Sequence, residues 1–127
     1  MPDAPQTYAV RLTAQARQDI FHAAERLAEL ADDPSLARAW AGALYEAVAR
    51  LATNPRAYTV LARETRLFGQ DIQRMLFRRS ARAAAYHVLF AVADASADGP
   101  IVTILHVRHG SRRPLSRAEA LRILANP

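Results

Sequence analysis

Residues 101–115 read IVTILHVRHGSRRPL, and this stretch decides the fold. Its first seven residues are apolar or β-branched, with the exception of one histidine, and this composition predicts a β-strand. The strand runs directly into a group of basic and titratable residues: His106, Arg108, His109, Arg112 and Arg113. Guanidinium groups bind phosphate, and imidazole exchanges protons near neutral pH. The stretch therefore points to RNA chemistry or to recognition of a partner more than to small-molecule metabolism.

Two further strands are expected on the N-terminal side of this stretch. Residues 86–92 alternate with the period of two that a half-buried strand requires, and residues 72–78 form another candidate. The polar loop at 94–99 predicts that the last two strands form a hairpin. If Val92 pairs with Ile101, His87 lies directly opposite His106. A register shift of two residues would leave every side chain on the same face of the sheet but would give His87 a different cross-strand partner.

The alternation assigns a face of the sheet to each strand residue. The core face is expected to hold Tyr86, Val88, Phe90 and Val92, then Ile101, Thr103, Leu105 and Val107, and also Met75 and Phe77. The opposite face would then hold five basic or titratable residues: Arg74, Arg78, His87, His106 and Arg108. One interpretation is an anion-binding face with imidazoles at its centre. The other is the solvated free face of an antiparallel sheet, because such a face is normally polar.

The first half of the chain predicts a strand followed by a helical hairpin. Residues 7–12 alternate as a strand, and Thr13 is placed to cap a helix from 14 to about 30. Asp33 and Pro34 suit the cap and the first position of a second helix, which Asn54 and Pro55 end. The buried side of this second helix is expected to hold Leu36, Trp40, Leu44, Val48 and Leu51.

The remaining segments complete the predicted fold. Residues 55–71 are expected to be irregular, and Ser116 with Glu119 has the spacing of a capping box for a short final helix over about 117–125. The apolar positions of that helix are Ala120, Leu121 and Leu124. The order β-α-α-β-β-β(-α) predicts an α+β protein in which the helical hairpin packs on a four-stranded sheet. We expect residues 1–127 to form a single domain with its core at about 7–115.

The net charge of +5 is distributed unevenly along the chain. Residues 1–60 carry six arginines against seven acidic residues, whereas residues 61–127 carry eleven arginines against five. All 17 of the Lys and Arg positions are arginine. A bias in codon usage is as good an explanation of the missing lysines as any functional one, but it does not explain the uneven distribution of charge. The basic second half favours an anionic partner, either nucleic acid or an acidic protein segment.

Other features of the sequence argue against several classes of protein. The chain has no cysteine, which excludes disulfides and thiolate chemistry. No apolar run approaches the roughly 18 residues of a membrane span. The first ten residues lack the pattern of a signal peptide, so we expect a cytoplasmic protein without a membrane partner. Two cross-strand histidines without a neighbouring carboxylate give too few ligands for a metal, and no motif for a cofactor is present.

The residue types at the strand end fit RNA cleavage by attack of a 2′-hydroxyl. That reaction needs a base with a pKa near neutral, a donor for the leaving oxygen, and cations for the charged phosphorane. The candidate catalytic residues are therefore His87, His106, Arg108 and His109. A second set, expected to bind nucleic acid or a protein partner, consists of Arg74, Arg78, Arg79, Arg112 and Arg113.

Several segments of the chain resemble the RelE/ParE superfamily, the toxins of type II toxin–antitoxin systems. The opening YAVRLTAQARQDI at 8–20 is similar to that family's first strand and the start of its first helix, and LATNP at 51–55 to the end of its second helix. YHVLF at 86–90 and ILHVRHGSRRPL at 104–115 resemble its central hairpin, in the variant labelled plasmid stabilisation protein. Each motif is short, but their order and spacing over residues 7–115 are together fairly specific.

The resemblance implies a RelE/ParE-like fold with a curved, mostly antiparallel sheet. It also implies growth inhibition that a cognate antitoxin neutralises, with an acidic or amphipathic antitoxin segment wrapped around the toxin. The predicted arginine set would then face this antitoxin or the target. ParE-like members act on DNA gyrase, whereas RelE-like members are endoribonucleases that cleave ribosome-bound mRNA, here without a metal.

The chain departs from the nuclease pattern at several positions. His87 stands where the nucleases often have an arginine, only arginines occur where they favour lysines, and no tyrosine follows Tyr86. Residues 108–113, RHGSRR, fit the ParE type at least as well. The alternative is a degenerate family member that binds only its antitoxin or nucleic acid and has no enzymatic activity. The sequence leaves the oligomeric state and the choice between gyrase and mRNA open.

Overall fold

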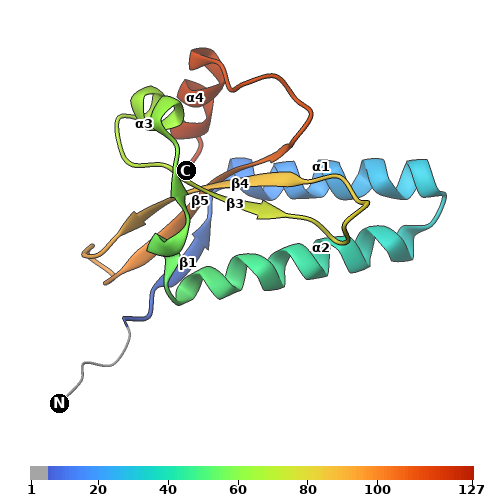
Figure 1. The fold of residues 1–127 in the computed structure, drawn as a ribbon, viewed down its shortest axis with the longest axis horizontal. Coiled ribbons are helices and arrows are strands. Elements are labelled where there is room, and N and C mark those ends of the chain that lie inside the picture. The colour runs from blue at the N-terminus through green and yellow to red at the C-terminus, as the bar shows by residue number, and fades with distance from the viewer. Residues whose placement is uncertain (1–5) are drawn as a thin grey trace.

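The computed structural model describes residues 6–127, which are built around a mixed sheet (Figure 1). Its five strands are β1 (Ala9–Leu12), β2 (Thr59–Val60), β3 (Gln73–Phe77), β4 (Tyr86–Ala93) and β5 (Ile101–His109). The strand order is β1-β5-β4-β3-β2, with β1 parallel to β5 and the other neighbours antiparallel. The predicted four-stranded sheet lacked β2, because two residues are too few to produce an alternating pattern.

Two long helices, α1 (Ala14–Ala31) and α2 (Pro34–Ala49), form the expected hairpin (Figure 1). The Thr13 hydroxyl caps α1 by accepting a hydrogen bond from the backbone N–H of Ala16. Asp33 caps α2 in the same way through Ser35, directly before the proline that begins the helix. The predicted caps and the start of each helix are therefore confirmed.

The hairpin and the sheet enclose a core that we call the inner core. Its fully buried side chains include Ile20, Leu44 and Val48 from the helices, and Val88, Phe90, Val102 and Ile104 from the strands. Each such side chain contributes on the order of 2 kcal/mol to folding. Leu36, expected on the buried side of α2, is instead 55% exposed. It lies in the first turn of α2, where the hairpin extends past the strands (Figure 1).

The opposite face of the sheet is covered rather than free. The helices α3 (Ala62–Phe68) and α4 (Arg117–Leu124) contribute to a second cluster, the outer core, whose buried members are Phe68, Ile72, Leu89, Leu105, Leu115, Ala120 and Ile123. The capping box of α4 is confirmed, but Ile123 is buried while Leu121 and Leu124 are exposed. The expectation that residues 55–71 are irregular is wrong, since they form a 3-10 helix (Pro55–Ala57), β2 and α3.

A β-bulge in β5 decides which of its residues face each core. Leu89 lies opposite His106 and Phe90 opposite Ile104, so Leu105 is an extra residue in the ladder. The side chain of Ile104 therefore packs in the inner core and that of Leu105 in the outer core. The predicted core face is correct for Val107 but wrong for Leu105, and Ile101 and Thr103 belong to neither core.

Candidate functional site

Six of the nine predicted site residues line one cleft on the outer face of the sheet, which we call the sheet-side cleft. They are Arg74, His87, Arg108, His109, Arg112 and Arg113, and the cleft has a volume of about 280 Å³. Strand pairing brings them together, because His87 lies opposite Arg108 and Arg74 opposite Leu89 on three adjacent strands. The predicted pairing of His87 with His106 is wrong, because Val92 pairs with Val102 and the bulge shifts the register further.

His87 is a half-buried imidazole between two guanidinium groups. Burial lowers the pKa of His87, and the charges of Arg74 and Arg108 lower it further, against a smaller opposing effect of Glu64. The ring is therefore neutral at pH 7. The loop after β5 passes close to it: a Cβ added to Gly110 would lie 3.5 Å from His87 Nε2 and only 2.9 Å from the Ala85 carbonyl oxygen. Glycine is the residue that this approach allows.

Arg108 is the most tightly held residue of the predicted site. Its side chain is 6% exposed, and its Nη1 lies 2.8 Å from a carboxylate oxygen of Glu119 in α4. Its Nε and Nη2 both donate to the backbone carbonyl of Arg113, at 3.1 and 2.6 Å. The hydrogen bond from Arg108 is the main cause that lowers the pKa of Glu119 to about 2. The guanidinium thus joins β5 to α4 and to the loop between them.

His106 lies outside the sheet-side cleft and is buried. Its Nδ1 lies 2.6 Å from a carboxylate oxygen of Asp19 in α1, and this oxygen also accepts a hydrogen bond from the backbone N–H of Val107. Its Nε2 lies 3.3 Å from Nη1 of Arg108. Because a guanidinium group only donates, Nε2 is the acceptor and Nδ1 carries the hydrogen. Both ring nitrogens of His106 are therefore engaged within the protein.

His109 is placed at the open end of β5. Its Nδ1 accepts a hydrogen bond from the backbone N–H of Ser111 at 3.0 Å, and the Ser111 hydroxyl lies 2.6 Å away. The neutral ring therefore carries its hydrogen on Nε2. The ring also packs edge-on against Tyr86, with a distance of 5.1 Å between the ring centroids. This geometry leaves one N–H donor of fixed direction on a residue at the cleft.

The other predicted arginines differ in position. Arg112 is about half exposed, and its only ion pair among residues 6–127 is with Glu119, at 3.7 Å. Arg113 is exposed and its side chain lines the sheet-side cleft. Arg78 and Arg79 are exposed in the turn between β3 and β4, where Arg78 donates to the carbonyl of Ala81, and neither lines this cleft.

A family model described as the ParE toxin of the type II toxin–antitoxin system, parDE, matches residues 10–114, which is most of the chain. This chain belongs to the ParE toxin family. The family resemblance seen in the sequence is thus confirmed, and with it a toxin that is paired with an antitoxin. A search of curated proteins and a search of solved structures give no match.

Two carboxylates that hold the site of this ParE family member were not singled out in the sequence. Asp19 is the polar residue directly before the buried Ile20 of α1, and it holds His106. Glu119 was recognised only as part of a capping box, yet its second oxygen binds Arg108. A carboxylate placed beside a buried helical stripe is the feature that would have suggested both.

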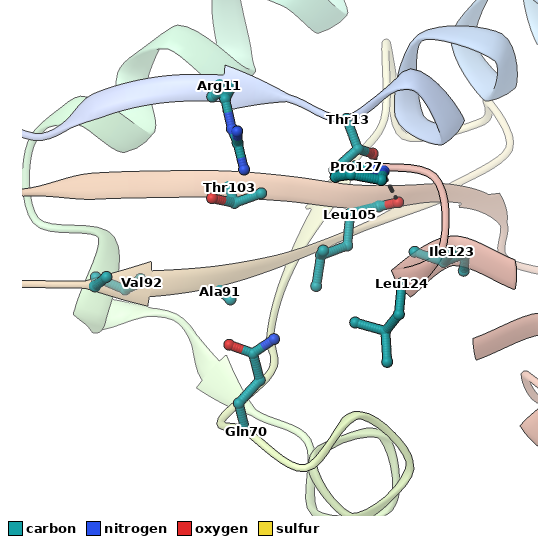
Figure 2. A pocket seen from close by; sticks show the side chains of 11 residues that line it. Arg11, Thr13, Gln70, Ala91, Val92, Thr103, Leu105, Ile123, Leu124 and Pro127 are labelled. Atoms are coloured by element: carbon teal, nitrogen blue, oxygen red, sulfur yellow. Dashed lines mark hydrogen bonds between the residues drawn. The ribbon is translucent and has the colours of Figure 1, made fainter. Parts of the chain in front are cut away.

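A separate groove lies on the outer face of this toxin, beside Ala91 and Leu105 (Figure 2). The side chains of Leu105, Leu124 and Gln70 border it, and Arg11 from β1 is the one charged side chain that lines it within residues 6–127. The Thr13 hydroxyl at its edge donates to the Leu105 carbonyl at 3.2 Å. Among the described residues that line this groove, none is an aspartate, a glutamate or a histidine.

Residues 6–127 of the ParE chain contain neither a cluster of metal ligands nor a helix suited to a membrane. Within that part of the chain, no three or more His, Cys, Asp or Glu side chains are grouped to hold a metal ion. No helix in the same range has both the length and the apolar character needed to cross a bilayer.

Proposed function

We propose that this ParE family member inhibits growth by binding DNA gyrase, and that a cognate antitoxin neutralises it in the cytoplasm. The burial of two candidate catalytic residues favours gyrase over mRNA as the target. Arg108 and His106, two of the four candidate catalytic residues, are buried and already bonded to Glu119 and Asp19. A nuclease needs such groups at the substrate, whereas a toxin that acts by binding needs them only to hold its surface in shape.

The sheet-side cleft supports an acidic or amphipathic antitoxin segment as a partner. Its exposed rim carries Arg112 and Arg113, and Arg74 lies further inside, with Glu64 as the one carboxylate lining the cleft. A cationic concave surface of this kind favours an anionic segment that orders when it binds. The same surface is available for the target when the antitoxin is absent, which would explain how the antitoxin blocks the toxin.

Cleavage of ribosome-bound mRNA is a second candidate, favoured by His87. A neutral imidazole flanked by the cations Arg74 and Arg108 has the character of a general base beside a phosphate site. In such a metal-independent endoribonuclease His87 would accept the 2′-hydroxyl proton, and the Nε2–H of His109 would donate a hydrogen bond to the leaving oxygen, which would take its proton from water. A family member that only binds its antitoxin, without either activity, is the remaining alternative.

The two targets separate in parallel assays on purified protein. We expect inhibition of gyrase supercoiling by the toxin and its relief by a small acidic antitoxin encoded beside it. Toe-printing of a defined mRNA in cell-free translation is expected to show no cleavage. Position-specific cleavage without gyrase inhibition would reverse the assignment, and the absence of both activities together with normal growth on expression would favour the binding-only alternative.

His87→Ala sharpens this experiment. Loss of a general base lowers the rate of a nuclease by roughly 10²–10⁴-fold. Gyrase inhibition is expected to change by only a few fold, because the imidazole is half-buried and neutral. A loss of growth arrest by more than a hundredfold in this variant, with unchanged thermal stability, would favour the nuclease.

A further inference from the structure

A second cleft lies on the opposite face of the sheet, between α1 and the end of β5. We call it the helix-side cleft. Its polar lining residues are Asp19, His22, Arg26, Tyr86, His109 and Arg112, and its volume is about 190 Å³. Tyr86 was expected on the core face of the sheet, and Arg26 was not among the predicted site residues. Yet His22 and Arg26 are four residues apart on α1, a spacing that places both on one side of the helix.

Tyr86 lines this cleft, and its hydroxyl is a donor without a partner among residues 6–127. The ring packs against Trp40 and His109. The hydroxyl has no hydrogen-bond partner among residues 6–127, and its oxygen is therefore not completely buried. Burial raises the pKa of Tyr86, opposed by the charge of Arg26, which lies close enough to act on it. The hydroxyl therefore stays protonated near neutral pH and donates to whatever enters.

The charged groups of the cleft favour an anion. None of the ion pairs within residues 6–127 includes Arg26, and Arg112 has only the distant Glu119. Asp19 is the one carboxylate of the lining, and it already accepts from His106 and from the backbone N–H of Val107. The two guanidinium groups of Arg26 and Arg112 thus outnumber the Asp19 carboxylate, and the described lining of the cleft keeps an excess of positive charge.

The two clefts meet at the end of β5. His109 and Arg112 line both of them, so one imidazole and one guanidinium stand between the two faces of the sheet. His109 presents an Nε2–H donor because Ser111 occupies its other nitrogen. Ligand pockets for whole organic molecules measure roughly 300–1,000 Å³. At about 280 and 190 Å³, both clefts lie below that range, and their guanidinium groups suit a phosphate group.

We propose that the phosphodiester backbone of nucleic acid binds across the end of β5, with one phosphate in each cleft. Arg74 and Arg113 hold the phosphate on the sheet side, and Arg26 with the Tyr86 hydroxyl holds the phosphate on the helix side. His109 and Arg112 lie between them. Since no base is read, binding does not depend on sequence and weakens steeply with salt. This contact does not involve gyrase, so its failure would leave the proposed target unaffected.

Fluorescence anisotropy with the purified full chain tests this proposal. The probes are labelled 12-nucleotide single-stranded DNA, the same sequence as RNA, and the DNA duplex. The variants are Arg26→Gln for the helix-side cleft and Arg74→Gln for the sheet-side cleft. Arg38→Gln, an exposed position on α2 that lines neither cleft, serves as the matched control. Arg26→Lys keeps the charge, and the thermal melting of each variant is measured beside wild type.

Each cleft variant is expected to weaken binding about tenfold and to reduce the salt slope by roughly one unit, as loss of one phosphate contact does. Arg26→Lys should retain most of the affinity, and Arg38→Gln should match wild type. The probe that binds most tightly identifies the form of nucleic acid. Binding of any one of the three probes supports the proposal if Arg26→Gln weakens the binding of that probe. Wild-type affinity in a folded Arg26→Gln overturns it. Equal binding of a labelled 12-residue polyglutamate, with the same response to the variants, also overturns it in favour of an acidic protein segment.

Discussion

Arg108 and Arg112 are four residues apart and point toward the same carboxylate, yet they occupy opposite environments. Arg108 is 6% exposed and lies 2.8 Å from Glu119, whereas Arg112 is 51% exposed and lies 3.7 Å from the same oxygen. The buried pair is short and has further hydrogen bonds to the Arg113 carbonyl. The exposed pair is long and screened by water, and such pairs contribute little to stability.

The two arginines differ in role: Arg108 stabilises the surface, whereas Arg112 is part of the surface that binds. Arg108, with His106 and their partners Asp19 and Glu119, joins α1, β5 and α4 into one arrangement. Arg112 is presented by that arrangement to both clefts. Two residues of identical type in one basic stretch therefore have different expected phenotypes: loss of stability for the first and loss of binding for the second.

Removing the buried guanidinium is expected to have the largest effect. Arg108→Met leaves the Glu119 carboxylate buried without its partner, which should lower the free energy of unfolding by about 4 kcal/mol. Urea denaturation measures this change. The double variant Arg108→Met with Glu119→Gln retains the capping box without a stranded charge and should recover much of the loss. Unchanged stability in Arg108→Met, combined with loss of growth arrest, would instead place Arg108 at the target.

Acid should break the same pair in the wild-type protein. The pKa of Glu119 is lowered from 4.5 to about 2 in the folded state, so its contribution to stability is complete above about pH 4.5 and lost as pH falls toward 2. The loss is on the order of 3 kcal/mol. Urea titrations at several pH values should show this decline, and Glu119→Gln should remove it from the profile. An identical pH dependence in the variant would contradict the assignment.

The loop that separates the two arginines should tolerate little change. Gly110→Ala places a Cβ 2.9 Å from the Ala85 carbonyl oxygen, which is backbone and cannot move aside easily. The Gly110 N–H also donates to that oxygen at 2.8 Å. We expect a loss of about 2 kcal/mol in unfolding free energy. Gly42→Ala is a matched control, since nothing lies within 4 Å of its Cβ position, and it should not destabilise the protein.

The smallest effect on stability is expected at the exposed arginine. Arg112→Gln should change the free energy of unfolding by less than about 0.5 kcal/mol, because the residue is half exposed and weakly paired. Growth arrest on expression should nevertheless weaken, since both clefts lose a cation. A destabilisation comparable to that of Arg108→Met would show that the two arginines do not divide their roles in this way.

Much of the fold could be predicted because local patterns in the sequence agree with the final packing. Thr13, Asp33 and Ser116 all cap the helices that their positions indicated. The strands β3, β4 and β5 lie within about two residues of their predicted limits. The strand β2 and the helix α3 were missed because two and seven residues are too short to establish a period.

The candidate site was predicted in composition better than in arrangement. Strand alternation correctly put Arg74, His87 and Arg108 on one face. It could not reveal that Asp19, 87 positions away in sequence, would engage His106. Nor could it reveal that Glu119 would engage Arg108. Partners that are distant in the chain leave no local pattern, so burial of the two central candidates became apparent only in three dimensions.

The extra residue at Leu105 divides β5 into two halves of opposite phase. Before it, the even-numbered residues Val102 and Ile104 lie in the inner core, and after it the odd-numbered Val107 does so. If Leu105 instead paired as an ordinary residue of a regular ladder, with Ile104 held in place, Val107 would turn away from the inner core and Arg108 would turn toward the apolar helices. One unpaired residue therefore reverses the alternation of faces partway along the strand. The same strand can then fill a core at its beginning and present charged groups at its end.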